Sequence, residues 1–230
     1  MEVSAVQNAR IFFEKTGDAK YISHLDLMRC FSRAITRAEI PLWYTEGFNP
    51  RPYMNFAMPL SLGMEGLLEI LDIRVSDDNM KLSEVKERLM KVMPPDIKII
   101  DVKEPKLKAQ LVAFSRYKIE IMQDKMSAKA FNNVVFEKLS DENLTISKVG
   151  KQGKQKVVKE IALTGHIKDV KIWSDEDKIT TILVTLPSNP TFGVNPSILI
   201  TRVLELISVD PVYVHITRKC MLDENLDKFE

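Results

Sequence analysis

The sequence is poor in the residues that most often bind metals. Only two cysteines and three histidines occur in 230 residues, and neither Cys30 nor Cys220 has a second Cys or His at ligand spacing. Zinc fingers and iron–sulfur clusters need several such ligands close together. We therefore expect no metal site and no cofactor, and we expect both cysteines to pack as small apolar side chains.

Long hydrophobic runs are also missing. No apolar run reaches the roughly 18–20 residues that a membrane-spanning helix needs. The N-terminus lacks the basic and then apolar pattern of a signal peptide, and the acidic Glu2 lies at its start. These absences predict a cytoplasmic protein that makes no contact with a membrane.

An excess of one charge is absent as well. Lysine and arginine together number 33, aspartate and glutamate 32, and the formal net charge is +1. Nucleic-acid binding therefore cannot be inferred from the overall charge, and an argument for it depends on where the cations lie along the chain.

What the chain does contain is ordinary for a globular protein, with 45% hydrophobic and 28% charged residues. Strand and helix patterns alternate as β-α-β-β-α-β in the first half, and a similar order starts again after a polar stretch. We predict an α+β fold with two tandem ferredoxin-like halves and antiparallel sheets. The expected boundaries are 1–104 and 111–230, joined by a linker at 105–110.

The first predicted helix begins at Ser23 and runs to about Ala38 before Pro41. Ser23 can cap its first turn, and Asp26 suits the positive end of the helix dipole. Leu27, Phe31, Ala34 and Ala38 recur at helical spacing and should face the core. Arg29, Arg33 and Arg37 recur every four residues on a different face. They are candidates for binding a phosphate backbone, although a solvated helix face has the same pattern.

A proline-stiffened loop, Gly47-Phe48-Asn49-Pro50-Arg51-Pro52, follows a short strand at Leu42–Thr45. Gly47 permits a positive φ, and the prolines restrict the backbone around Arg51. Phe48, with Tyr44 and Tyr53 beside the loop, could stack on a base while Asn49 and Arg51 contact the rest of a nucleotide. The alternative is a structural loop with Phe48 buried and Arg51 paired to Glu46 or Asp26.

His24, at the helix N-terminus, is the candidate for catalysis. A histidine near arginines could act as a general base on an RNA 2′-hydroxyl. The alternative is a first-turn residue that packs beside Tyr21 and forms local hydrogen bonds.

Two further groups of charged residues are ambiguous. Lys151, Lys154 and Lys156 lie in a glycine-containing basic stretch that we expect to be a loop between strands, either contacting RNA or forming the mobile, solvated tip of a hairpin. Glu69 and Asp72 interrupt an apolar strand at Leu67–Val75, and their spacing places them on opposite faces. We expect one of the two carboxylates to pair with an arginine of the first helix.

Residues 10–75 carry a dense resemblance to a known family. The matching runs are F-x-K-x-G within Phe12–Gly17, YISHLDLMR at Tyr21–Arg29, RAITRAEIP at Arg33–Pro41, YTEGFNPRP at Tyr44–Pro52, PLSLG at Pro59–Gly63, and LEILDI with Glu69 and Asp72. This segment resembles the radical SAM-linked protein family, whose members are domains of unknown function fused to or encoded beside B12-binding radical SAM proteins.

The resemblance implies a partner more than an activity. The chain lacks the three-cysteine motif of radical SAM enzymes, so it would be an accessory protein that recognises RNA, such as tRNA or rRNA, or presents a substrate to a radical SAM protein. The first half is also similar in outline to the RNA-processing proteins of CRISPR systems. A metal-independent endoribonuclease using His24 is therefore one alternative, and a purely protein-binding subunit is another.

Overall fold

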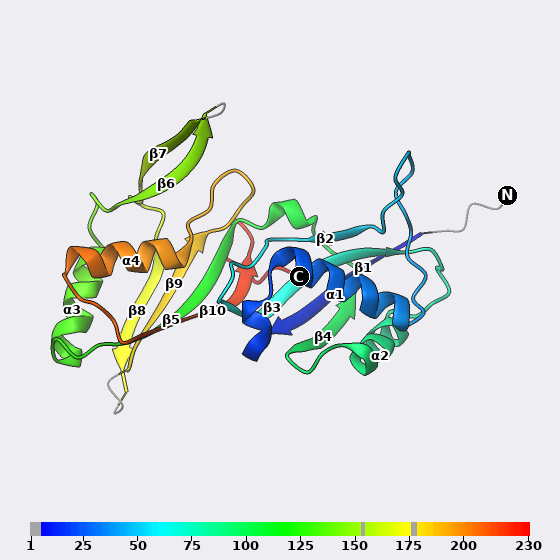
Figure 1. The fold of residues 1–230 in the computed structure, drawn as a ribbon, viewed down its shortest axis with the longest axis horizontal. Helices are drawn as coiled ribbons and strands as arrows, with labels where there is room; N and C mark the ends of the chain where they lie inside the picture. Colours follow the sequence, from blue (N-terminus) through cyan, green and yellow to red (C-terminus); the bar gives the residue numbers. More distant parts are fainter. Residues whose placement is uncertain (1–5, 153–154, 176–178) are drawn as a thin grey trace. The chain divides into compact units, whose positions relative to one another are not determined.

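The computed structural model describes residues 6–152, 155–175 and 179–230. Within these ranges the chain has the predicted α+β fold, with four α-helices and a mixed eight-stranded sheet (Figure 1). It divides into two compact units, the first comprising Met1–Ala113 and Arg218–Glu230, and the second Phe114–Thr217. None of the described helices is long and apolar enough to span a membrane.

The first unit follows the order β-α-β-β-α-β. Its elements are β1 (Gln7–Lys15), α1 (His24–Arg37), β2 (Met54–Phe56), β3 (Glu65–Val75), α2 (Leu82–Val92) and β4 (Ile97–Lys103). Strand β1 lies between β4 and β3, antiparallel to both, and β2 pairs antiparallel with β3. The pairs Asn8–Arg74 and Arg10–Asp72 are opposite one another in the β1–β3 ladder, and Asn55 is opposite Asp72 in the β2–β3 ladder.

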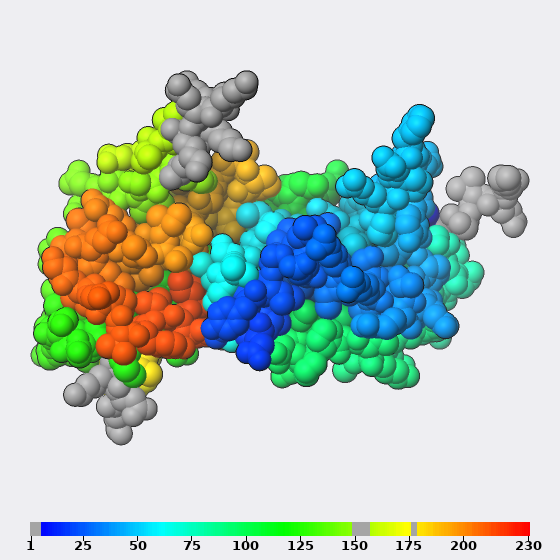
Figure 2. Space-filling view, viewed as in Figure 1, coloured from blue at the N-terminus to red at the C-terminus, as the bar shows by residue number. Residues whose placement is uncertain are grey.

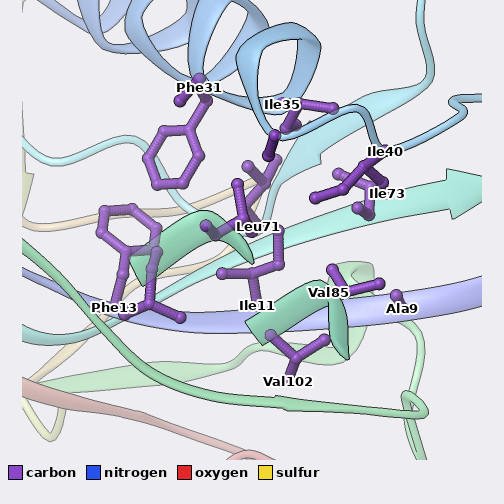
Figure 3. Packing of buried hydrophobic residues seen from close by; sticks show 14 of the residues in the cluster. Ala9, Ile11, Phe13, Phe31, Ile35, Ile40, Leu71, Ile73, Val85 and Val102 are labelled. Atoms are coloured by element: carbon purple, nitrogen blue, oxygen red, sulfur yellow. The ribbon is translucent and has the colours of Figure 1, made fainter. Parts of the chain in front are cut away.

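The core of the first unit forms where α1 and α2 cover one face of this sheet. The predicted stripe of Leu27, Phe31, Ala34 and Ala38 is buried, as helical periodicity requires. Figure 3 shows Phe31 and Phe13 facing each other across this layer, and their ring centroids lie 4.8 Å apart in an edge-on arrangement. The opposite sheet face is covered by a smaller apolar cluster of Phe12, Ile70, Val112, Met221 and Phe229.

The second unit contains two more helices, and side chains cap both of them. Its elements are β5 (Phe114–Met122), α3 (Ala128–Leu139), β6 (Thr145–Gln152), β7 (Gln155–Ala162), β8 (Lys168–Ser174), β9 (Ile179–Pro187), α4 (Pro196–Leu206) and the start of β10 (Tyr213–Leu222). Ser127 accepts a hydrogen bond from the Ala130 amide, and Asn195 accepts one from the Ser197 amide. Strand β9 lies between β5 and β8 and is antiparallel to both.

The basic stretch predicted as a loop is mostly a β-hairpin, so that prediction is wrong for its flanks. Strands β6 and β7 form a two-stranded sheet in which Lys151 is opposite Lys156. Only the tip of the stretch, with Lys154, lies outside the described residues. Cross-strand pairs such as Ile146–Ile161 favour pairing over an open loop.

The last strand links the two units along the chain. Strand β10 continues to Leu222, and the residues from Arg218 onward belong to the first unit. The expected 111–230 half therefore differs from the observed second unit at its C-terminal end. The backbone amide of Ala113 donates to Leu222 O at 2.9 Å, which holds the end of the first segment to this C-terminal segment.

Candidate functional site

Helix α1 presents its arginines to solvent. Ser23 caps the helix as predicted, and its hydroxyl accepts a hydrogen bond from the Asp26 amide at 3.1 Å. Arg29 is paired with Asp26 at 3.1 Å, with both side chains more than half exposed. This exposed pair holds the arginine only weakly. Hydrogen bonding from Ser23 and from Arg29 keeps the pKa of the Asp26 carboxyl below its usual range.

The other two arginines of α1 differ in their contacts. Arg37 donates to the backbone oxygen of Val92 at 3.0 Å, which ties the end of α1 to the end of α2. Arg33 is exposed and, within the described ranges, has no hydrogen bond or ion pair. Of the predicted stripe, Arg33 is therefore free, Arg29 is loosely held, and Arg37 already has a structural contact.

Residues 42–53 form a projecting hairpin, which we call the arm. It leaves the edge of β3, where the Trp43 amide donates to Arg74 O at 2.9 Å. Its two sides are joined by hydrogen bonds from the Tyr53 amide to Trp43 O and from the Thr45 amide to Arg51 O. In Figures 1 and 2 the blue-to-cyan segment between α1 and β2 extends away from the helices of its unit.

The tip of the arm is fully open to solvent. Phe48 has a relative exposure of 105%, and Tyr44 has 53%. Gly47 has φ +131°, which an L side chain rarely adopts. The Arg51 backbone amide donates to Thr45 Oγ1, while its exposed side chain contacts neither Glu46 nor Asp26. The structure thus rejects the alternative in which Phe48 is buried and Arg51 is paired to a carboxylate.

The base of the arm is built on stacked rings. The Arg74 guanidinium carbon lies 4.3 Å from the centroid of the Tyr53 ring and 5.1 Å from that of Trp43. These distances are typical of cation–π contacts. Tyr53 is therefore held at the base of the arm, whereas Phe48 and Asn49 are exposed at its tip. In the described parts of the chain, no hydrogen bond or ion pair connects the arm to the arginines of α1.

His24 contacts an aromatic cluster and not Tyr21. Its ring lies 5.1 Å from that of Phe56 and nearly perpendicular to it. Partial burial, with a smaller contribution from the charge of Lys15, lowers the pKa of His24. The imidazole has no hydrogen-bond partner among the residues described, so its nitrogens are available. No arginine contacts this ring in the described structure, so the charge stabiliser that phosphoryl chemistry needs is not in place.

A buried ion pair below α1 is the feature that the sequence analysis missed. Arg218 Nε donates to Glu69 Oε1 at 2.9 Å, its Nη2 donates to Glu69 Oε2, and the same nitrogen donates to Met58 O at 2.7 Å. Both side chains are almost completely buried. Lys15 is buried nearby, and this desolvation lowers its pKa even though Glu69 opposes the shift. The lysine donates to Lys20 O at 3.4 Å.

The second carboxylate of β3 is also paired, but on the other sheet face. Arg10 binds Asp72 through two hydrogen bonds of 2.7 and 2.8 Å. It also donates to Leu107 O at 2.8 Å and to Glu230 O at 2.9 Å. The expected pairing of Glu69 or Asp72 with an arginine of α1 is therefore wrong. The predicted linker at 105–110 is attached to the sheet through Leu107.

Carboxylate, cysteine and histidine side chains do not gather into a metal centre in the part of the chain that the structure describes. No group of three or more of these residues is close enough to hold an ion. What the first unit offers instead is a set of exposed or partly exposed cations and aromatic rings on α1 and the arm.

Comparison with known proteins gives a fold and a family. The chain is similar to a chain in a crystal structure of a Cbf5-Nop10-Gar1 complex, with a TM-score of 0.51 and 8% identity. The match covers 93% of this chain and 48% of that chain, so this chain spans about half the length of its match. At that identity the similarity concerns the fold alone.

A second similar structure is that of a glycine cleavage system transcriptional repressor, described as putative in its own title. The identity is 12%, and the match covers 94% of this chain and 100% of that chain, with a TM-score of 0.26 that supports no argument. None of the curated proteins matches. The model of DUF2344, described as "Uncharacterized protein conserved in bacteria", matches residues 8–196. The chain therefore belongs to the DUF2344 family.

Proposed function

We propose that this protein binds RNA as an accessory protein of a radical SAM system, and that the arm and the exposed face of α1 form the contact surface. The observation that carries the proposal is the fully exposed Phe48 at the tip of a hydrogen-bonded hairpin, with the unpaired Arg51 beside it. An aromatic ring in water is unfavourable unless it has a partner to cover it. An unpaired base offers a flat partner of suitable size.

The cations near this ring support a nucleic-acid partner over an apolar one. Arg51 lies three residues from Phe48, and its side chain has no carboxylate partner within the described ranges. Arg33 on α1 is also free, and Arg29 has only an exposed partner that a phosphate could replace. Guanidinium groups bind phosphate oxygens through two parallel hydrogen bonds.

The link to a radical SAM protein follows from the resemblance of residues 10–75. With only two cysteines, this chain does not supply the three-cysteine cluster motif. The iron–sulfur chemistry would therefore belong to the partner, and this chain would bring the RNA to it. Such a pair would act in the cytoplasm, where tRNA and rRNA are found.

We also propose that each half of the chain is a ferredoxin-like fold. The order β-α-β-β-α-β in the first unit, with β1 between β3 and β4 and β2 on β3, supports this. In the second unit β5, β8, β9 and β10 would be the equivalent strands, and the β6–β7 hairpin would be an insertion after α3. Tandem domains of this kind present broad sheet and loop surfaces, although the fold alone does not fix a function.

The proposal is tested by measuring the binding of fluorescein-labelled single-stranded RNA and tRNA over a range of salt concentrations. Phe48→Ala should weaken binding by roughly 5- to 150-fold, which corresponds to about 1–3 kcal/mol for one base stack. Arg51→Ala and Arg33→Ala should each reduce the slope of log K against log salt concentration by about 0.7. Phe136→Ala, at a half-exposed site on α3, is a matched control that should change nothing.

Unchanged RNA affinity in all three variants would refute the proposed surface. If the protein instead retains a radical SAM enzyme during purification without RNA, and Phe48→Ala releases that enzyme, the arm is a protein-binding element. That result would favour the alternative of a purely protein-binding subunit.

A metal-independent endoribonuclease is a second candidate, and His24 favours it. Burial lowers its pKa, which favours the neutral ring, and its nitrogens are free in the described structure, as a general base requires. Incubation of the protein with end-labelled RNA and a metal chelator tests this candidate. Cleavage that His24→Ala abolishes would support it, and no cleavage by the unaltered protein would refute it.

A further inference from the structure

A pocket on the first unit has the features of a small-molecule site and was not anticipated from the sequence. It has a volume of about 400 Å³ and is lined by Asn8, Tyr53, Asn55, Asp72, Ile73, Arg74 and residues 105–110. All of these residues belong to one unit. The volume falls within the range of roughly 300–1,000 Å³ that is typical of ligand pockets.

The polar lining arises from the alternation of side chains along three strands. Asn8 is opposite Arg74, and Asn55 is opposite Asp72, so these four residues lie on the same face of the sheet. The wall formed by residues 105–110 is fixed, because Arg10 donates to Leu107 O at 2.8 Å and Ala109 is buried. The pocket is therefore held between a paired sheet and an anchored segment.

Several polar groups that line this pocket lack partners in the described structure, in contrast with the charges buried elsewhere in the unit. The side-chain amides of Asn8 and Asn55 make no hydrogen bond with any described residue. The Arg74 guanidinium is held against the rings of Tyr53 and Trp43 but has no described hydrogen-bond acceptor. A guanidinium group fixed in place with its donors free is prepared to bind an anion.

The charge of the pocket can be assigned residue by residue. Asp72 is neutralised by its two hydrogen bonds from Arg10. Lys106 is paired with Glu230 at 3.1 Å. Arg74 and Lys108 are left without a counter-charge among the described residues. Two uncompensated cations match the charge of about −1.5 to −2 that a phosphate monoester carries at pH 7.

We infer that this pocket binds one nucleotide. The planar face would lie against Tyr53 and the flat Arg74 guanidinium, the phosphate would be bound by Arg74 and Lys108, and the amides of Asn8 and Asn55 would bind polar edges of the base or ribose. A carboxamide supplies both a donor and an acceptor, which suits the edge of a base. The nucleotide is either a free monophosphate or a terminal nucleotide of an RNA strand that ends in a phosphate monoester, because both present the same chemistry. The pocket does not depend on the exposed tip of the arm.

Isothermal titration calorimetry of the full chain with AMP, GMP, CMP and UMP tests this inference, with inorganic phosphate and the matching nucleosides as comparison ligands. At least one monophosphate should bind more tightly than phosphate or nucleoside alone by tenfold or more. Arg74→Ala should weaken that binding at least tenfold, and Lys108→Ala severalfold. Lys108 is exposed and has no described partner, so its replacement leaves the fold intact and keeps the test valid if Arg74→Ala unfolds.

Two further measurements separate the pocket proposal from the arm proposal and distinguish the two sources of the nucleotide. Phe48→Ala removes the tip aromatic of the arm but should leave monophosphate binding unchanged, so failure of the arm proposal and failure of the pocket proposal are distinguishable. Competition of the tight monophosphate with labelled RNA would assign the pocket to an RNA nucleotide, and binding of both without competition would assign it to a free one. The inference would be overturned if no monophosphate bound at millimolar concentration. It would also be overturned if the Arg74→Ala and Lys108→Ala variants bound the monophosphate as tightly as the unaltered protein does.

Discussion

Gly66→Ala should destabilise the first unit because of one contact beneath α1. Gly66 is opposite Lys15 in the β1–β3 ladder. A Cβ atom at this position would lie 2.6 Å from both Cγ and Cδ of Glu69, closer than real Cβ contacts. Glu69 cannot swing aside freely, because Arg218 holds both of its carboxylate oxygens. The added methyl group therefore competes directly with the buried ion pair.

The size of the effect follows from that competition. Breaking a buried ion pair by displacing one partner costs about 3–5 kcal/mol. Replacing glycine with alanine returns about 0.4–1 kcal/mol by restricting the unfolded chain. The net loss in the free energy of unfolding should be about 2–4 kcal/mol, which for a chain of this size lowers the melting temperature by roughly 5–15 °C.

Urea denaturation measures this loss when it is followed by the fluorescence of Trp43 in a Trp173→Phe background, because Trp43 lies in the first unit. Gly193→Ala is the matched control, since a Cβ there would meet nothing closer than 3.9 Å. Gly66→Ala should cost almost nothing once Glu69 is replaced by alanine. An equal cost with and without Glu69 would refute the reasoning, because the penalty would then not arise from the ion pair.

Three further predictions concern the buried charges. Lys15 has a lowered pKa, so the folded state binds its proton less tightly than the unfolded chain does. The free energy of unfolding should therefore rise as pH rises toward 10.5. Urea titrations at several pH values measure this rise, and Lys15→Met should flatten it. His24 also has a lowered pKa; stability should fall as pH drops below 6.5, where the unfolded chain takes up the proton first, and His24→Gln should remove this part of the acid sensitivity. Asp72→Asn should lower the free energy of unfolding by about 3–5 kcal/mol, because it leaves Arg10 buried without its charge partner. It should also speed hydrogen exchange at the Ala109 amide. Exchange at the rate of the unaltered protein would contradict the anchoring contact of Arg10 with Leu107 O.

Local pattern predicted most of the elements. Helix α1 begins after the Ser23 cap and ends at Arg37, close to the predicted end at Ala38. The apolar stripe of Leu27, Phe31, Ala34 and Ala38 is buried, as its spacing predicts. These features depend on neighbours within four residues along the chain, and such information is present in a single sequence.

The ion pairs could not be predicted in the same way. Glu69 and Arg218 are 149 residues apart, and Arg10 and Asp72 are 62 apart. The acidic residues inside a strand predicted a partner among the arginines of α1, and this is wrong, because nothing local identifies which arginine supplies the charge. The actual partners lie on strands that only the sheet topology brings near.

The exposure of the arm could not be predicted from the sequence for a different reason. A phenylalanine between glycine and prolines fits both a buried loop and an exposed tip, and the sequence left this open. The choice is made by backbone pairing across residues 43–53, which extends the hairpin beyond the sheet and leaves Phe48 without neighbours. The prediction of a loop for the basic stretch with Lys151 and Lys156 is wrong for a related reason. Its glycine suggested a loop, but cross-strand pairing of β6 with β7 outweighs that local preference.

The near-zero net charge of the chain does not prevent a basic binding surface, because local charge depends on which cations have a carboxylate partner. In the first unit, Glu69 and Asp72 each hold an arginine in the interior, where leaving a charge unpaired would be costly. Each of these pairs removes one acid and one base from the surface, so the charge balance of the rest of the chain is unchanged. Arg33, Arg51 and Arg74 have no carboxylate partner among the described residues, and they carry their charge where solvent or a ligand can reach it. A chain with nearly equal numbers of acidic and basic residues can thus present local positive charge to an anionic partner. In this protein the unpaired arginines lie beside exposed or stacked aromatic rings.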